Sequence, residues 1–93
     1  LPEHCIIIGV GCQSGYDNCI VIGENLKAKC EGHVLIQCGA KIIVDKVMSG
    51  IEMSEFRKML KPFNDFGQEW EKCQDKFNDA LDNVDEELRK AGL

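Results

Sequence analysis

The chain has 93 residues, of which 44% are hydrophobic, and carries a formal net charge of −5. This length allows one domain with a modest core, which usually gains stability from a partner or an oligomer. No basic cluster suits phosphate contacts and no apolar run approaches the length of about eighteen residues that a membrane span needs, so we expect neither direct nucleic-acid binding nor a membrane-spanning segment.

The first half of the chain repeats with a period of fourteen residues. From His4 on, the three blocks read HCIIIGVGCQSGYD, NCIVIGENLKAKCE and GHVLIQCGAKIIVD. Each block has three successive apolar positions. A glycine follows them in the first two blocks, and Gln37 takes its place in the third. Repeats of this kind stack and share one core, because a single unit cannot bury its own apolar face. The pattern predicts a three-rung parallel β-roll, or β-helix, over residues 4–48.

The apolar columns of the repeat predict an oligomer. Side chains of a strand alternate between its faces, so residues 6, 8, 20, 22, 34 and 36 would fill the roll. The column between them would then point outward, and it consists of Ile7, Val21 and Leu35. An outward apolar column on a small protein implies an interface or a covering helix. We therefore expect a homo-oligomer with Ile7, Val21 and Leu35 at its interface.

The first two blocks resemble the fourteen-residue head repeat of trimeric autotransporter adhesins and some phage fibres. The matching residues of the second block are Ile20, Val21, Ile22, Gly23 and Ala28, and those of the first are Ile6, Ile7, Ile8, Gly9 and Ser14. The third block departs, because Gln37 replaces the glycine and Ile42 the small residue. The resemblance implies a left-handed parallel β-roll that trimerises, with a structural role.

Six cysteines are present, and Cys5, Cys19 and His33 share one column of the repeat. Without a recognisable secretory signal we expect reduced thiols that pack as small apolar side chains. Adjacent rungs would lie about 4.8 Å apart, which is too close for an ordinary chelating ladder, and paired Cys-x2–4-Cys loops are absent. The sequence therefore predicts no metal site and no cofactor.

Motifs for catalysis are also missing. The chain contains two histidines and three serines, with no nucleophile elbow, Walker loop or paired-carboxylate motif. Cys19 and His33 would be neighbours in the stack, so a Cys–His pair stays open, although nothing supplies an oxyanion site. We predict no catalytic residues and no enzyme activity.

The composition changes at residue 51, and all four phenylalanines and the only tryptophan follow it. Ser54 as N-cap and Glu55 in the first turn predict a helix over about 52–61, which stops or bends at Pro62. We expect an α+β fold in which residues 1–50 form the repeats. Residues 51–93 would form a helical segment, packed on the roll or on neighbouring subunits as one compact unit.

A second helix should follow a capping box of Asp65 and Gln68 and end between about Lys90 and Gly92. A heptad-like aromatic stripe runs across both helical segments and leaves two alternatives open. The segments form either a coiled coil, or a hairpin or kinked helix that folds back on the roll, and we favour the second alternative. The opposite face is acidic and is either solvated or a partner-binding surface. The candidate binding residues are Asp75, Asp79, Asp82 and Glu86.

These features lead to three functional hypotheses. The first is a non-catalytic oligomeric binding or assembly module that acts through protein–protein contacts, like an adhesin head or a fibre. The second is a small acidic phage or mobile-element inhibitor of a bacterial defence protein, similar to anti-CRISPR factors, that binds a basic host surface. The third is an oligomeric sponge that sequesters a small nucleotide signal. We expect a cytoplasmic location, with a virion or cell-surface fibre as the alternative.

Overall fold

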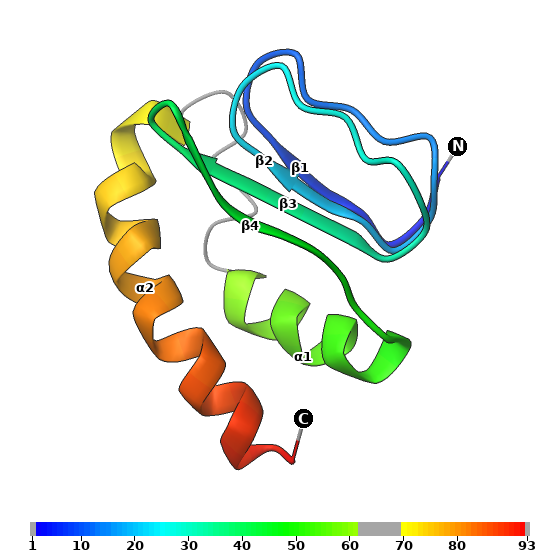
Figure 1. The fold of residues 1–93 in the computed structure, drawn as a ribbon, viewed down its shortest axis with the longest axis vertical. Coiled ribbons are helices and arrows are strands. Elements are labelled where there is room, and N and C mark those ends of the chain that lie inside the picture. Colours follow the sequence, from blue (N-terminus) through cyan, green and yellow to red (C-terminus); the bar gives the residue numbers. More distant parts are fainter. Residues whose placement is uncertain (1, 62–69, 93) are drawn as a thin grey trace.

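The computed structural model describes residues 2–61 and 70–92, without the side chains of residues 70–73, 78, 81, 84 and 85. One mixed sheet contains β1 (Ile6–Ile8), β2 (Ile20–Ile22), β3 (His33–Cys38) and β4 (Lys41–Val47), in that order. The helices α1 (Gly50–Leu60) and α2 (Trp70–Lys90) follow the strands in the chain (Figure 1). The predicted α+β class is confirmed.

The first three strands run parallel with an offset of fourteen residues. Ile6 pairs with Ile20, and Ile20 pairs with Val34. Away from the sheet, Gln13 and Lys27 form a parallel bridge with the same offset. Residues 4–17 and 18–31 are therefore two stacked coils, which we call the first and the second coil. The predicted alignment of the apolar columns is confirmed for these strands.

The third block forms no third coil. After β1 and β2 the chain bends at Gly9 (φ +112°) and Gly23 (φ +149°), a conformation that L side chains rarely adopt. Gln37 stands at the third such position, where β3 continues as a strand and β4 then returns antiparallel to it. The predicted three-rung architecture is therefore wrong for residues 38–48, because a non-glycine residue keeps the chain extended where the coil would bend.

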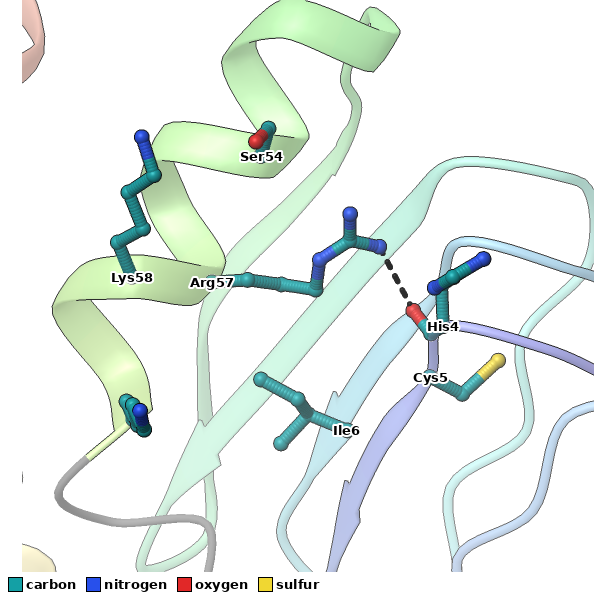
Figure 2. A pocket seen from close by; sticks show the side chains of 7 residues that line it. His4, Cys5, Ile6, Ser54, Arg57 and Lys58 are labelled. Atoms are coloured by element: carbon teal, nitrogen blue, oxygen red, sulfur yellow. Dashed lines mark hydrogen bonds between the residues drawn. The ribbon is translucent and has the colours of Figure 1, made fainter.

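The helix α1 begins after Ser49, five residues before the predicted N-cap, Ser54. The Ser49 hydroxyl accepts a hydrogen bond from the Glu52 N–H, and the Glu52 carboxylate accepts one from the Ser49 N–H, which completes a capping box. Near its other end, Arg57 donates to the His4 carbonyl oxygen at 2.9 Å (Figure 2) and to Asn18 Oδ1 at 3.0 Å. Both acceptors lie just before β1 and β2, so α1 is tied to both coils.

The helix α2 ends close to the predicted position. Gly92 follows it with φ +83°, and its N–H donates to the Arg89 carbonyl oxygen at 3.0 Å, as is common at helix C-termini. The predicted capping box of Asp65 and Gln68 lies outside the described residues. None of the helices in the described ranges combines the length and apolar character needed to cross a membrane.

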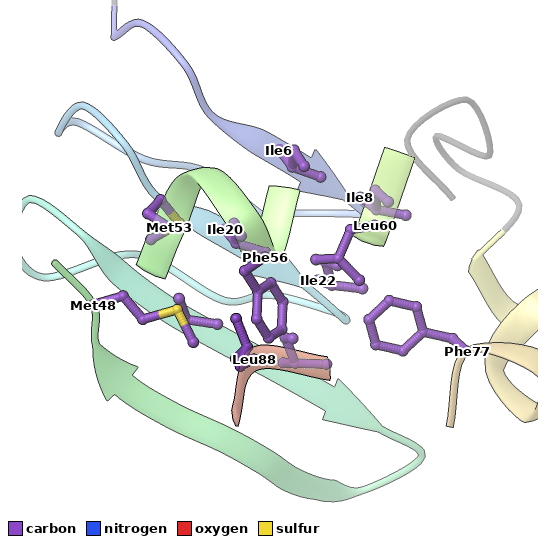
Figure 3. Close-up of a cluster of buried hydrophobic side chains, with 12 residues drawn as sticks. Ile6, Ile8, Ile20, Ile22, Met48, Met53, Phe56, Leu60, Phe77 and Leu88 are labelled. Carbon is purple, nitrogen blue, oxygen red and sulfur yellow. The ribbon is translucent and has the colours of Figure 1, made fainter. Parts of the chain in front are cut away.

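The main core lies between the sheet and the helices (Figure 3). Its side chains are Ile6, Ile8, Ile20, Ile22, Val34 and Ile36 from the parallel strands, Met48, Met53, Phe56 and Leu60 from the segment that ends in α1, and Phe77 and Leu88 from α2. Every member is at most 6% exposed. Both helices therefore fold back onto the sheet.

A second, smaller core lies on the other face of the sheet, inside the coils. It contains Cys19, Val21 and Ala28, all at most 1% exposed, and Leu35 is 7% exposed. The predicted outward direction of the column is therefore wrong for Val21 and Leu35, and only Ile7, at the end of the stack, is 39% exposed. The residues expected to fill the roll face the helices instead. Whether the chain oligomerises stays a prediction.

Candidate functional site

Four carboxylates line the exposed side of α2, and we call them the acidic stripe. Asp75, Asp79, Asp82 and Glu86 recur at intervals of four, three and four residues. This spacing places them along one side of a helix with about 3.6 residues per turn. All four side chains are exposed. The predicted partner-binding residues thus share one accessible surface, and their role in binding stays a prediction.

The opposite side of α2 fixes the direction of the stripe. Phe77 is fully buried and Leu88 is 6% exposed, and both belong to the main core. In the first turns, Gln74 Oε1 accepts a hydrogen bond of 2.8 Å from the N–H of Gly39, between β3 and β4. Because the helix is held at the hairpin and along its apolar side, the acidic stripe faces away from the protein.

The negative charge of the stripe is not neutralised locally. The α2 segment contains seven acidic and four basic residues. Its Lys90 Nζ lies 3.4 Å from Glu87 Oε1, but both side chains are more than half exposed, so the pair stabilises little. Within the described part of the chain, no carboxylate of the stripe has an ion-pair partner. Because acidic residues outnumber basic ones in α2, the stripe presents net negative charge to an approaching molecule.

The cysteine column satisfies backbone carbonyls inside the coils. Cys5 Sγ lies 3.2 Å from the Tyr16 carbonyl oxygen, and Cys19 Sγ lies 3.1 Å from the Cys30 carbonyl oxygen. Each acceptor is eleven residues further along, so each thiol donates across its own coil. A small apolar side chain with a weak donor suits this position. Cys5, Cys12, Cys19, Cys30 and Cys38 form no disulfide.

We expect reductant to leave the melting temperature of the folded protein unchanged, since these five cysteines form no disulfide. Differential scanning calorimetry with and without reductant measures this. As an internal control, iodoacetamide should modify the half-buried Cys12 in the folded protein before the fully buried Cys19. A drop of several degrees on reduction, or stoichiometric zinc in elemental analysis, would contradict the expectation.

His33 continues the cysteine column and has both ring nitrogens engaged. Its Nδ1 accepts the Lys29 N–H at 3.1 Å, so the proton is on Nε2, which lies 2.7 Å from Asp45 Oδ1 and donates to it. Neither nitrogen is left to activate Cys19, so this arrangement is not a nucleophile–base pair. Among the described residues, no group of three His, Cys, Asp or Glu side chains is placed to hold a metal ion.

Sequence reasoning missed that two side chains close one end of the coil stack. Besides the bond from Lys29 to His33, Gln37 Oε1 accepts the Glu24 N–H at 2.9 Å. Backbone donors of the second coil that a third coil would satisfy are thus capped by β3. The signal was present in the sequence, because Gln37 and His33 are positions at which the third block departs from the first two.

An open depression of about 400 Å³ lies between α1 and β1 (Figure 2). It is lined by His4, Cys5, Ile6, Ser54, Arg57, Lys58 and Lys61. Arg57 already donates to two acceptors, and Lys58 Nζ lies 3.1 Å from Glu55 Oε1. Cations in the last turn of α1 also complement the helix dipole. The cationic lining therefore has a structural explanation.

No protein-family model matches the chain, and comparisons with curated proteins and with solved structures find no match either.

Proposed function

We propose that the chain is a non-catalytic protein-binding module whose partner surface is the acidic stripe of α2. The observation that carries the proposal is a row of four exposed carboxylates on a helix that is anchored to the core, with no ion-pair partner for them among the described side chains. Such a row attracts a basic protein surface and increases the rate of encounter.

The geometry suits an elongated basic groove. From Asp75 to Glu86 the stripe extends about 16 Å along the helix axis, at about 1.5 Å per residue. Because burial of Phe77 and Leu88 fixes the rotation of α2, the carboxylates need little further ordering on binding. Preorganisation of this kind lowers the entropic cost of association.

We further propose that the two coils are rungs of a parallel β-roll related in design to adhesin and fibre head repeats, and that they serve assembly into a homo-oligomer. The fourteen-residue register of β1, β2 and β3 and the glycine corners at Gly9 and Gly23 support this proposal. In this role the chain would be part of a virion or of a cell-surface fibre.

The acidic stripe also favours a second candidate function. A small acidic protein that occupies the basic groove of a bacterial defence protein would inhibit it by competition, in the manner of anti-CRISPR factors. This inhibitor would act in the cytoplasm. The identity of the captured partner separates the two functions, since a fibre component binds a structural protein or receptor and an inhibitor binds a nucleic-acid-binding host protein. A protein that sequesters a small nucleotide would need a pocket whose cations are available for its phosphates. In the open depression, Arg57 and Lys58 already bond to other groups of the protein.

Reversal of charge in the stripe is expected to weaken partner binding at least about tenfold, because several steering contacts change sign together. The test compares Asp79→Lys/Asp82→Lys with Glu24→Lys/Glu31→Lys in quantitative capture from bacterial lysate. Both double variants change the net charge by the same amount, and all four positions are exposed. Circular dichroism should show that both remain folded.

The outcome distinguishes the stripe from a general effect of charge. We expect the α2 variant to lose the partner and the coil variant to keep it, with the wild-type interaction weakening as salt screens the charges. Equal capture by the wild type and the α2 variant in low salt would place the partner surface elsewhere.

A further inference from the structure

The two edges of the sheet differ in how they are protected. β4 carries Lys41, Asp45 and Lys46, and its pairing with β3 shifts register after Ile36. Charged side chains and bulges on an edge strand oppose pairing with another chain. β1 has neither feature, because it consists of three isoleucines that pair with β2 in unbroken register. Among the described residues, no strand pairs with its outer edge.

Apart from His4 and Asp17 at its two ends, the first coil, which ends the stack on that side, contains no charged residue. Residues 5–16 contain no acidic residue, lysine, arginine or histidine, whereas the second coil contains two glutamates and two lysines. Ile7, Val10 and Tyr16 of the first coil are 39%, 56% and 47% exposed. In the described residues, no strand beyond β1 supplies caps of the kind that Gln37 and His33 of β3 provide at the other end. An uncapped, apolar end of a repeat stack is typical of an interface.

The backbone of Ile7 points its hydrogen-bonding groups away from β2. The Ile6 N–H donates to the Cys19 carbonyl oxygen, and the Ile8 carbonyl oxygen accepts the Gly23 N–H. These two residues therefore direct their groups toward β2. Because these groups alternate in direction along a strand, the N–H and C=O of Ile7 lie on the outer edge.

We propose that the free end of the first coil is a self-association face, on which a second copy of this chain pairs its β1 antiparallel to the first, with the two-fold axis at Ile7. Each Ile7 then donates its N–H to the Ile7 carbonyl oxygen of the other copy. Ile6 lies opposite Ile8 of the second copy, and the apolar column of Ile7, Val21 and Leu35 continues into the second stack.

A second copy fits this face better than a charged partner does. An isologous contact places the same residues against each other, so the absence of charge in residues 5–16 removes the repulsion that self-pairing otherwise causes. If two copies paired through their β4 strands instead, the contact would have to accommodate the charge of Lys41 or Lys46. It would also disturb the bulge between β3 and β4. The inference deepens the assembly role proposed above and rests on it, but it is independent of the acidic stripe.

The test compares Ile7→Lys with Ile42→Lys. The two isoleucines are matched, because they lie on opposite edge strands and are 39% and 41% exposed. Sedimentation over a range of concentrations should give the wild type and Ile42→Lys a mass of two 10.4 kDa chains. Ile7→Lys should weaken dimerisation about 100-fold or more, because each dimer would bury two facing ammonium groups.

A second measurement needs no variant and does not depend on how well Ile7→Lys folds. In hydrogen exchange followed by NMR, the Ile7 amide should be protected at concentrations at which the wild type is dimeric and should exchange faster on dilution. A monomeric wild type, a mass of three chains, or dissociation by Ile42→Lys but not by Ile7→Lys would overturn the proposal. Loss of capture in Asp79→Lys/Asp82→Lys with a monomeric wild type would reject this face and retain the acidic stripe.

Discussion

The Gly9→Ala variant is expected to lose about 4 kcal/mol of unfolding free energy, a large share of the stability of a small domain. Gly9 has φ +112°, and a Cβ there would overlap the carbonyl oxygen of Gly23 in the next coil. The backbone strain costs about 1–3 kcal/mol, and displacement of a packed neighbour costs a similar amount. Urea denaturation followed by circular dichroism measures the loss.

Two other glycines separate strain from overlap. Gly39→Ala has the strain alone, because φ is +62° and nothing lies within 4 Å of the added Cβ, so it should lose about 1 kcal/mol. Gly15→Ala has neither the positive φ nor a close neighbour and should change stability by less than about 0.5 kcal/mol. Equal losses at Gly9 and Gly39 would mean that the two coils do not approach as closely as described.

The fourteen-residue period is the feature that the sequence predicts best. It aligns Ile6 with Ile20 and Val34, and the strands pair in that register. Periodicity could not decide which way the columns point, because all three residues of each short strand are apolar. The direction of the columns depends on the helices, because they cover the face of the sheet that contains Ile6 and Ile8. Val21, on the other face, lies inside the coils.

The end of the repeat is marked by a single substitution. Gln37 breaks the glycine column, and this departure predicts a change in the path of the chain more directly than the apolar residues that continue to Val44. The prediction of a third rung relied instead on the apolar residues that continue to Val44. In the structure Gln37 has two roles, since it keeps β3 extended and caps the Glu24 N–H of the second coil.

The acidic stripe could be located from sequence, because helical periodicity alone places Asp75, Asp79 and Asp82 on one side. Whether that side would be free could not be predicted, since it depends on the burial of Phe77 and Leu88 against a sheet distant in sequence. The sequence predicted that Ile7 is exposed together with Val21 and Leu35, but only Ile7 is. Its exposure follows from its place at the end of the stack, and the same column is buried at Val21.

The Phe56→Ala variant is expected to lose about 3–5 kcal/mol of unfolding free energy. Phe56 is 2% exposed and lies in the main core with residues of the sheet and of α2 (Figure 3). Truncation removes an aromatic ring between three elements and leaves a cavity, because elements that also hold Met53 and Leu60 in place cannot collapse freely around it. Urea denaturation followed by circular dichroism again gives the free energy.

Ile51→Ala is the matched control for Phe56→Ala. Ile51 is an apolar residue of the same helix but is 69% exposed, so its truncation should change stability by less than about 0.5 kcal/mol. NMR signals of the second coil should be lost at the same urea concentration as the helical circular-dichroism signal, because one core joins the coils to the helices. If Phe56→Ala unfolds the helices while the Val21 and Ala28 signals persist, the coils fold without them, and the main core is not what stabilises the repeat.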